Sequence, residues 1–292
     1  MKRILPLFTI FLLFTYLSVA QTQISKKEKS ALIDLYQLTN GESWINSWSL
    51  KAPIAQWHGV HIENNHVVRI ELPKNNLQGN IPYTLKRLEH LEVLNLAFNK
   101  ITGLLPSTLT QLENLKSLKL EMNDIKGDLP WDFSNWSKLE ELTLFNNFLD
   151  GSLPETIGLA QNLRILNLSS NNFSGSLPKS LERLTKLESL GLLGNKLDGE
   201  IQISFENMTN LFELVLSHNR FEGALPNSIE GLSQLKFVQL QGNRFDTSKG
   251  LENIQSKELV AFDSDSDRLD RKYSKLPLSR TRTADTKFEN NN

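Results

Sequence analysis

Two histidines and a glutamate near residue 60 are the first side chains in the sequence that could do chemistry. Asn64-Asn65 lies between two alternating apolar runs and predicts a β-hairpin. In a tight turn Glu63 pairs with His66 and His61 with Val68, so that the imidazoles and the carboxylate share one face. That set could bind zinc. The alternative is a solvated polar face. We favour it because nothing else in the sequence supports a metal.

A second candidate metal site lies near the C-terminus, where aspartates alternate at Asp263, Asp265 and Asp267 as in the start of a calcium loop. Such a loop needs glycine in its sixth place and a carboxylate in its twelfth, and these places hold Arg268 and Ser274. No hydrolase elbow, phosphate loop, zinc-protease motif or kinase signature is present. We therefore expect a protein that is not an enzyme, with no metal and no cofactor.

Composition narrows the classes of partner and the compartment. The 292 residues include 32 basic and 33 acidic side chains, a net charge of −1 that gives no reason to expect nucleic acid as a partner. Cysteine is absent, which excludes disulfides, thiol nucleophiles and cysteine-based zinc sites.

The N-terminus predicts export. Met1-Lys2-Arg3 is basic, an apolar run extends from Ile4 to Val19, and small residues at Ser18 and Ala20 fit signal-peptidase cleavage. We predict a signal peptide over 1–20 and a secreted, extracellular or cell-surface protein, with the periplasm also possible. An uncleaved anchor is the alternative. No second apolar stretch reaches the ~20 residues of a membrane span, so we expect no stable span elsewhere.

A pattern of 24 residues must position whatever the protein uses, and its clearest copy is Leu163 to Pro178, LRILNLSSNNFSGSLP. It reads L-x-x-L-x-L-x-x-N-x-L-x-G-x-L-P. We number the places of each repeat from its first apolar position, so that repeat one begins at Val67. Place nine is always asparagine (Asn75, Asn99, Asn123, Asn147, Asn171, Asn195, Asn219 and Asn243).

A fixed period of this length with this leucine pattern predicts a leucine-rich repeat arc, an α/β solenoid of eight repeats over 67–245. The leucines at places one, four and six should point inward from short strands, which stack into one parallel sheet on the concave face. The asparagines should bond backbone groups that the turn leaves unpaired.

Caps should close both ends of the solenoid. Residues 21–66 form the N-terminal cap, in which Ser25 and Glu28 predict a capping box and a helix to about Leu38 with Ala31, Leu32, Leu35 and Leu38 on one face. We interpret Trp44, Trp48 and Trp57 as cap core, with a ligand-stacking platform as the alternative. Residues 246–262 should form the C-terminal cap, and 263–292 a polar, disordered tail.

The full motif, with its G-x-L-P extension, resembles the plant-type leucine-rich repeat of receptor ectodomains and polygalacturonase inhibitors. Ala31-Leu32-Ile33-Asp34-Leu35 and Trp57-His58-Gly59-Val60 are similar to that family's N-terminal cap. Plant members usually have cysteines where this chain has Ala55 and Ile62, which favours a secreted, cysteine-free, bacterial-like branch. The resemblance implies binding through variable positions of the concave face and transfers no individual functional residue.

Solvent-facing places of the strands carry the best functional information. Most are polar, but an apolar group occurs in repeats two to four: Val93, Phe98, Met122 and Phe145. A second group in repeats seven and eight comprises Phe212, Val215 and Phe237. Exposed aromatic and methionine side chains on a concave surface favour a contact site. The alternative is that they lean on neighbouring strands and shield the sheet.

These observations predict a secreted, non-catalytic, monomeric protein that binds a protein or polysaccharide through its concave face. An inhibitor or regulator of an extracellular carbohydrate-active enzyme is one alternative. A ligand-binding component of a cell-surface signalling system is the other.

Overall fold

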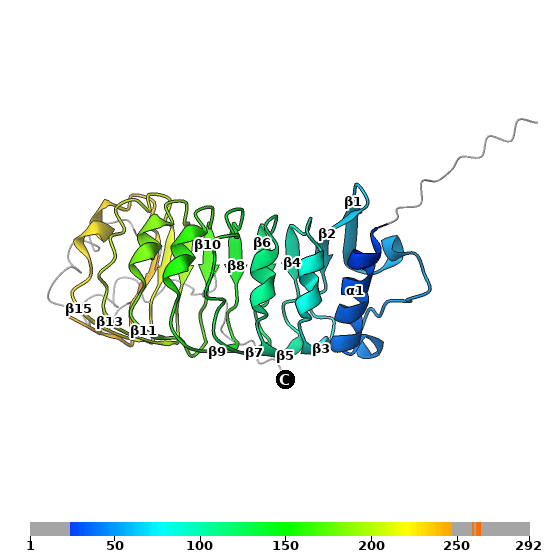
Figure 1. Ribbon diagram of the computed structural model, residues 1–292. Coiled ribbons are helices and arrows are strands. Elements are labelled where there is room, and N and C mark those ends of the chain that lie inside the picture. The colour runs from blue at the N-terminus through cyan, green and yellow to red at the C-terminus, as the bar shows by residue number, and fades with distance from the viewer. Residues whose placement is uncertain (1–23, 247–258, 260, 264–292) are drawn as a thin grey trace, which may run out of the picture.

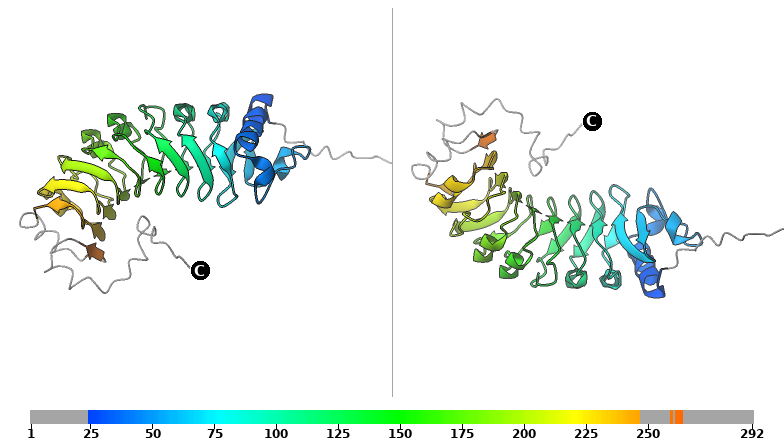
Figure 2. Two further views of the ribbon diagram at one scale, coloured as in Figure 1. Left: turned by 90° about the horizontal axis from the view of Figure 1, so that it is seen from below. Right: turned by 90° about the horizontal axis from the view of Figure 1, so that it is seen from above.

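The computed structural model describes residues 24–246, 259 and 261–263, which form a curved solenoid (Figure 1). A ten-stranded sheet lines the inner side of the arc (Figure 2). Its strands, in spatial order, are β1 (Val60–Glu63), β2 (His66–Glu71), β4 (Val93–Asn95), β6 (Ser117–Lys119), β8 (Glu141–Thr143), β10 (Ile165–Asn167), β12 (Ser189–Gly191), β14 (Glu213–Val215), β16 (Phe237–Gln239) and β18 (Ala261–Asp263). The β1–β2 pair is antiparallel and the later pairs are parallel, as the repeat predicts.

Two smaller parallel sheets follow the bend after the asparagine. One contains β3 (Gln78–Asn80), β5 (Lys100–Leu104), β7 (Asp124–Gly127) and β9 (Phe148–Leu149), and the other contains β11 (Ser174–Gly175), β13 (Lys196–Glu200), β15 (Arg220–Gly223) and β17 (Arg244–Phe245). Short 3-10 helices form much of the returning side: η3 (Tyr83–Arg87), η4 (Ser107–Gln111), η5 (Glu155–Leu159), η6 (Lys179–Arg183) and η7 (Asn227–Gly231).

The leucines form the core between these layers. Leu91, Leu94 and Leu96 of repeat two are fully buried, and so are their counterparts in the neighbouring repeats. On the returning side Phe133 and Leu181 are buried as well. Burial of this apolar surface is the main stabilising term, and each repeat obtains it only by contact with its neighbours.

The asparagines at place nine form the predicted ladder through the turns. Asn147 is typical: its Nδ2 donates to the carbonyls of Leu120 and Leu144, both at 3.0 Å. Its Oδ1 accepts from the backbone N–H of Ile125 at 3.0 Å. One buried side chain thus satisfies backbone groups of two repeats, which explains why the place does not vary.

The N-terminal cap begins with helix α1 (Lys26–Leu38), and Ser25 and Glu28 form the predicted capping box. Between α1 and β1 lie two 3-10 turns, η1 (Gly41–Ser43) and η2 (Ile54–Gln56). Ala31, Leu32 and Leu35 are buried, whereas Leu38, which was expected on the same face, is 51% exposed in the last turn of the helix.

The three tryptophans of the cap are core residues. Trp44, Trp48 and Trp57 are at most 4% exposed, and each indole N–H donates to a backbone carbonyl. Trp48 stacks on Trp57 with ring centroids 4.8 Å apart. Their burial leaves no ring face for a ligand, so the alternative of a stacking platform is wrong.

Some predictions fall on residues outside those described. They are the signal peptide over 1–20, most of the C-terminal cap and tail, and the calcium-like aspartates Asp265 and Asp267. Asp263 belongs to β18, which pairs with β16. Within the described part of the chain, no helix has the length and apolarity needed to cross a membrane.

Candidate functional site

The histidines near residue 60 are held apart by different partners. The hairpin register pairs Glu63 with His66 as predicted, but a bulge after His61 pairs that residue with Arg69, so the predicted pairing with Val68 is wrong. An extra residue in one strand changes the register in a way that alternation cannot reveal.

Their side chains approach two different carboxylates. The Nε2 atom of His61 lies 3.2 Å from a carboxylate oxygen of Glu71. The Nδ1 atom of His66 lies 3.4 Å from Glu28, and its ring stacks on His90. Among the described residues no group of three potential ligands could hold a metal ion, so the zinc alternative finds no site there.

Charged side chains on the concave strands are paired across repeats. Lys116 binds Glu92 at 2.8 Å, and Lys119 binds Glu141 at 2.8 Å. Arg164 donates Nε and Nη2 to one oxygen of Glu188. Because partners are 24 residues or nearly so apart in the chain, only the stacking of strands brings them together.

An ion pair within strand β2 shifts ionisation at the first repeat. Arg69 donates two hydrogen bonds to Glu71, and this contact lowers the pKa of the Glu71 carboxyl, while burial opposes it. The paired charges on the concave strands therefore neutralise one another, which leaves other places of the repeat to supply selective contacts.

A row of apolar side chains lies where the concave strands end, and it contains three of the four predicted site residues. We call Phe98, Met122 and Phe145 the apolar ridge. The backbone N–H of Phe98 donates to the carbonyl of Glu121 at 2.9 Å, and that of Met122 to the carbonyl of Phe145 at 2.9 Å. These bonds hold the three residues on adjacent turns of repeats two, three and four, with Phe98 and Met122 at place eight and Phe145 at place seven.

The backbone at place eight is left-handed in every repeat. Phe98 has a φ of 56° and Met122 a φ of 57°, whereas repeats six and eight use Gly194 and Gly242 at the same place. Left-handed backbone costs a residue with a Cβ about 1–2 kcal/mol. Phe98 nevertheless leaves 41% of its surface exposed, and Lys74 Nζ lies 5.0 Å from its ring centroid. A bulky exposed ring at a strained position favours a role in binding.

Val93 and the second apolar group do not share this setting. Val93 lies within strand β4, where it is in register with Arg69 of β2 and Ser117 of β6, and it is not part of the ridge at the strand ends. Val215 is fully buried and Phe237 is 7% exposed, so the prediction that they face solvent was wrong. Close stacking of adjacent strands encloses these two side chains within the concave sheet.

A buried carboxyl lies beside the ridge. Glu121, between Leu120 and Met122, is 9% exposed, and Thr143 Oγ1 donates to it at 2.6 Å. Burial raises the pKa of Glu121, and the hydrogen bond from Thr143 opposes that rise in part. The ridge thus rests on a group for which the charged form is disfavoured.

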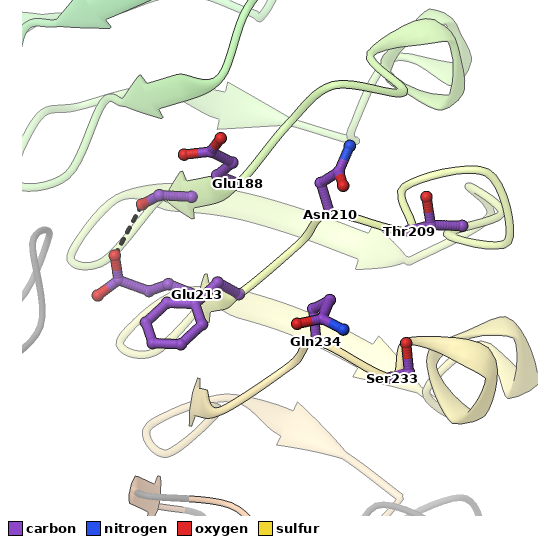
Figure 3. A pocket seen from close by; sticks show the side chains of 8 residues that line it. Glu188, Thr209, Asn210, Glu213, Ser233 and Gln234 are labelled. Atoms are coloured by element: carbon purple, nitrogen blue, oxygen red, sulfur yellow. Dashed lines mark hydrogen bonds between the residues drawn. The ribbon is translucent and has the colours of Figure 1, made fainter.

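A pocket of about 630 Å³ opens at the other end of the strands, over repeats six and seven (Figure 3). Phe212 is 44% exposed there and packs edge to face on Phe237. Ser189 Oγ donates to Glu213 at 2.7 Å on one wall. The described lining residues are Glu188, Ser189, Thr209, Asn210, Phe212, Glu213, Ser233 and Gln234.

Two family models described as leucine-rich repeats match the chain. One matches residues 65–125 and 202–245, and the other matches 138–159 and 162–184, together more than half of the sequence. The chain belongs to the leucine-rich repeat family. Among curated protein sequences, none matches this chain.

Solved structures of plant receptor ectodomains are similar to this leucine-rich repeat protein. The plant peptide hormone receptor RGFR1, in complex with RGF2, is 32% identical over 59% of this chain and 27% of its own, with a TM-score of 0.56. The PEPR1–AtPEP1 structure is 25% identical over 76% and 32%, with a TM-score of 0.69. The Arabidopsis receptor kinase HAESA, with the peptide hormone IDA and the co-receptor SERK1, is 26% identical over 76% and 42%, with a TM-score of 0.62.

The chain thus spans less than half the length of each of these receptor chains. The likeness confirms that the repeats are of the plant type, and the sequence of this chain contains no cysteine. Its assignment to a bacterial-like branch stays a prediction.

Sequence reasoning identified Phe212 but missed the pocket around it. Asn210 and Gln234 both occupy place 24, immediately before the first leucine, which the repeat motif leaves undefined. The signal that could have indicated the pocket is the alternation of asparagine and lysine at place 24, which ends at Gln234.

Proposed function

We propose that this protein is an extracellular, non-catalytic binding protein whose apolar ridge contacts an extended segment of a protein partner. The observation that carries the proposal is the exposed Phe98 ring on left-handed backbone, with Met122 and Phe145 beside it along adjacent repeats. Aromatic side chains at the centre of an interface typically supply much of the binding energy.

The dimensions of the ridge suit an extended peptide. Adjacent strands lie about 4.8 Å apart, so the ridge extends about 10 Å from Phe98 to Phe145, the length of about three residues of extended chain. Backbone hydrogen-bonding groups of such a peptide can reach polar side chains on the neighbouring concave strands. RGFR1 is a plant peptide hormone receptor, and HAESA binds the peptide hormone IDA, which supports this class of partner.

Display of random peptides on phage, selected against the full-length protein, would provide ligands for a quantitative test. Phe98→Ala should weaken a selected peptide by about 2 kcal/mol, or about 30-fold in Kd, measured by calorimetry. Phe148→Ala is a matched control, because Phe148 is an exposed aromatic residue of β9, in the smaller sheet formed with β3, β5 and β7. Equal affinities of the wild type and Phe98→Ala would remove the ridge as the binding site.

A component of a cell-surface signalling system is a second candidate, supported by the likeness to HAESA with its co-receptor. A co-receptor would need a second surface, so peptide binding by the ridge alone would not show it. Chemical cross-linking on the producing cell, with and without a selected peptide, tests this candidate: peptide-dependent capture of a membrane protein is expected. Inhibition of a carbohydrate-active enzyme stays a prediction from the sequence.

A further inference from the structure

The pocket over repeats six and seven lies where a regular pattern along the rim of the solenoid stops. Place 24 alternates between asparagine and lysine over four repeats and then continues with asparagine and glutamine. In chain order its residues from repeat two are Asn114, Lys138, Asn162, Lys186, Asn210 and Gln234.

The alternation builds a chain of hydrogen bonds on the surface. Asn114 Nδ2 donates to the carbonyl of Glu89 at 2.8 Å, and Lys138 Nζ donates to Asn114 Oδ1 at 2.7 Å. The next two repeats copy this arrangement, with Lys186 Nζ donating to Asn162 Oδ1. Each lysine thereby links its own repeat to the carboxamide of the repeat before it.

Gln234 replaces the third lysine and no hydrogen bond joins it to Asn210 in the described structure. Figure 3 shows both carboxamides on neighbouring segments at the pocket. The same repeat carries Phe212 at place two, where the other seven repeats have aliphatic or charged residues. Two departures from the repeat thus coincide at one cavity, a lost lysine and a gained aromatic ring.

The lining selects a class of ligand. Thr209, Asn210, Ser233 and Gln234 are exposed neutral side chains that can both donate and accept hydrogen bonds. No lysine or arginine is among the described lining residues, which disfavours phosphate or sulfate. Of the two lining carboxylates, Glu188 is already bound by Arg164, and Glu213 is buried and accepts from Ser189 Oγ, which disfavours a cationic ligand.

We propose that this pocket binds a neutral carbohydrate. A pyranose ring has an apolar face of C–H groups that can stack on the Phe212 ring, and hydroxyl groups around its edge that match the carboxamides of Asn210 and Gln234. The volume of about 630 Å³ lies within the range of about 300–1,000 Å³ that small-molecule sites occupy. The pocket is formed by other repeats than the apolar ridge, so this proposal does not rest on peptide binding.

The test uses the full-length protein and four probes, the β-1,4-linked tetrasaccharides of glucose, xylose, mannose and galactose. Saturation-transfer NMR at about 10 mM sugar detects ligands with a Kd of about 1 mM. We expect at least one probe to bind, and Phe212→Ala to weaken it by about tenfold or more. Absence of binding by all four would overturn the proposal.

A closing variant separates the pocket from a general loss of fold. Gln234→Lys restores the residue found at Lys138 and Lys186, whose amine should reach Asn210 Oδ1 and close the opening. We expect it to keep or raise the unfolding temperature while it abolishes sugar binding. Phe148→Ala, in strand β9, is the matched aromatic control, and this variant should bind the sugar as the wild type does. Sugar binding that survives both Phe212→Ala and Gln234→Lys would contradict the assignment.

Discussion

Places eight and nine of the repeat are neighbours in the chain but behave as two different regions of the molecule. The asparagines at place nine lie inside the turns and bond the backbone of two repeats, as Asn147 does. The residues at place eight share one left-handed backbone yet vary from glycine to phenylalanine. The fold needs the side chain at place nine and only the conformation at place eight.

This difference shows where a repeat protein can vary. A side chain that completes buried hydrogen bonds has no acceptable substitute, because each group left unpaired costs about 1–3 kcal/mol. A residue that meets only a conformational requirement can change with the ligand, at a penalty of about 1–2 kcal/mol for keeping a Cβ on left-handed backbone. Phe98 and Met122 have that penalty, whereas Gly194 avoids it.

Loss of a ladder asparagine should have the largest effect. Asn147→Ala removes the partners of the Ile125 N–H and of two carbonyls, so we expect the free energy of unfolding to fall by about 3 kcal/mol or more. Urea denaturation measures this change. Asn146→Gly, one residue earlier at a left-handed position, is the matched control and should stay within about 1 kcal/mol of the wild type. Similar losses at both places would break the comparison.

At place eight the relative stability of two variants should reveal the requirement for left-handed backbone. Phe98→Asn and Phe98→Ala lose the same ring, but asparagine tolerates left-handed backbone better. We expect the asparagine variant to be more stable by about 0.5–1 kcal/mol in urea denaturation. The same pair at Val93, within β4, should not show this order. A more stable alanine variant at Phe98 would contradict the conformational account.

A pH-dependent effect is expected at Glu121, beside the ridge. Burial raises its pKa in the folded protein above the ordinary value of 4.5. The folded state then holds the proton more tightly than the unfolded state, so stability is lost as pH rises from about 4.5 through the folded pKa. Glu121→Gln cannot ionise and should gain stability over the wild type as pH rises, with little difference at acidic pH. Thermal unfolding across pH 4–8 measures the gap, and a gap that is independent of pH would show that ionisation is not its cause.

The smallest effect should come from the contact between Lys74 and Phe98. A cation near an exposed ring stabilises by about 0.5–1 kcal/mol, and the Nζ atom lies 5.0 Å from the ring centroid. A double-mutant cycle of Lys74→Ala and Phe98→Ala should give a coupling of about 0.5 kcal/mol in urea denaturation. Additive single effects would show that Lys74 does not stabilise the Phe98 ring.

Much of the fold could be predicted from the sequence because the repeat states it eight times. Leu94 and Asn99 each occupy places where one residue type recurs, and their burial and bonding follow from that recurrence. The hairpin register was predicted correctly at Glu63 but not at His61, because a bulge leaves no trace in an alternating pattern.

The candidate sites were less predictable. Alternation along a strand predicts which face a residue lies on, and it was adequate for Phe98, which is exposed. It failed at Val215, which is fully buried on the same face, because exposure depends on side chains of the adjacent repeats as well. The pocket at Phe212 was missed for a related reason: it is formed by two repeats and has no motif in either of them.

The sequence by itself determined that this chain is a solenoid, since a 24-residue unit with one apolar face can bury that face only against another copy of itself. It also determined which places are scaffold. Only the tertiary structure decided which charges neutralise one another and which side chains stay exposed. Partners such as Arg164 and Glu188 come from successive strands stacked about 4.8 Å apart, and that contact exists only once the repeats have folded together.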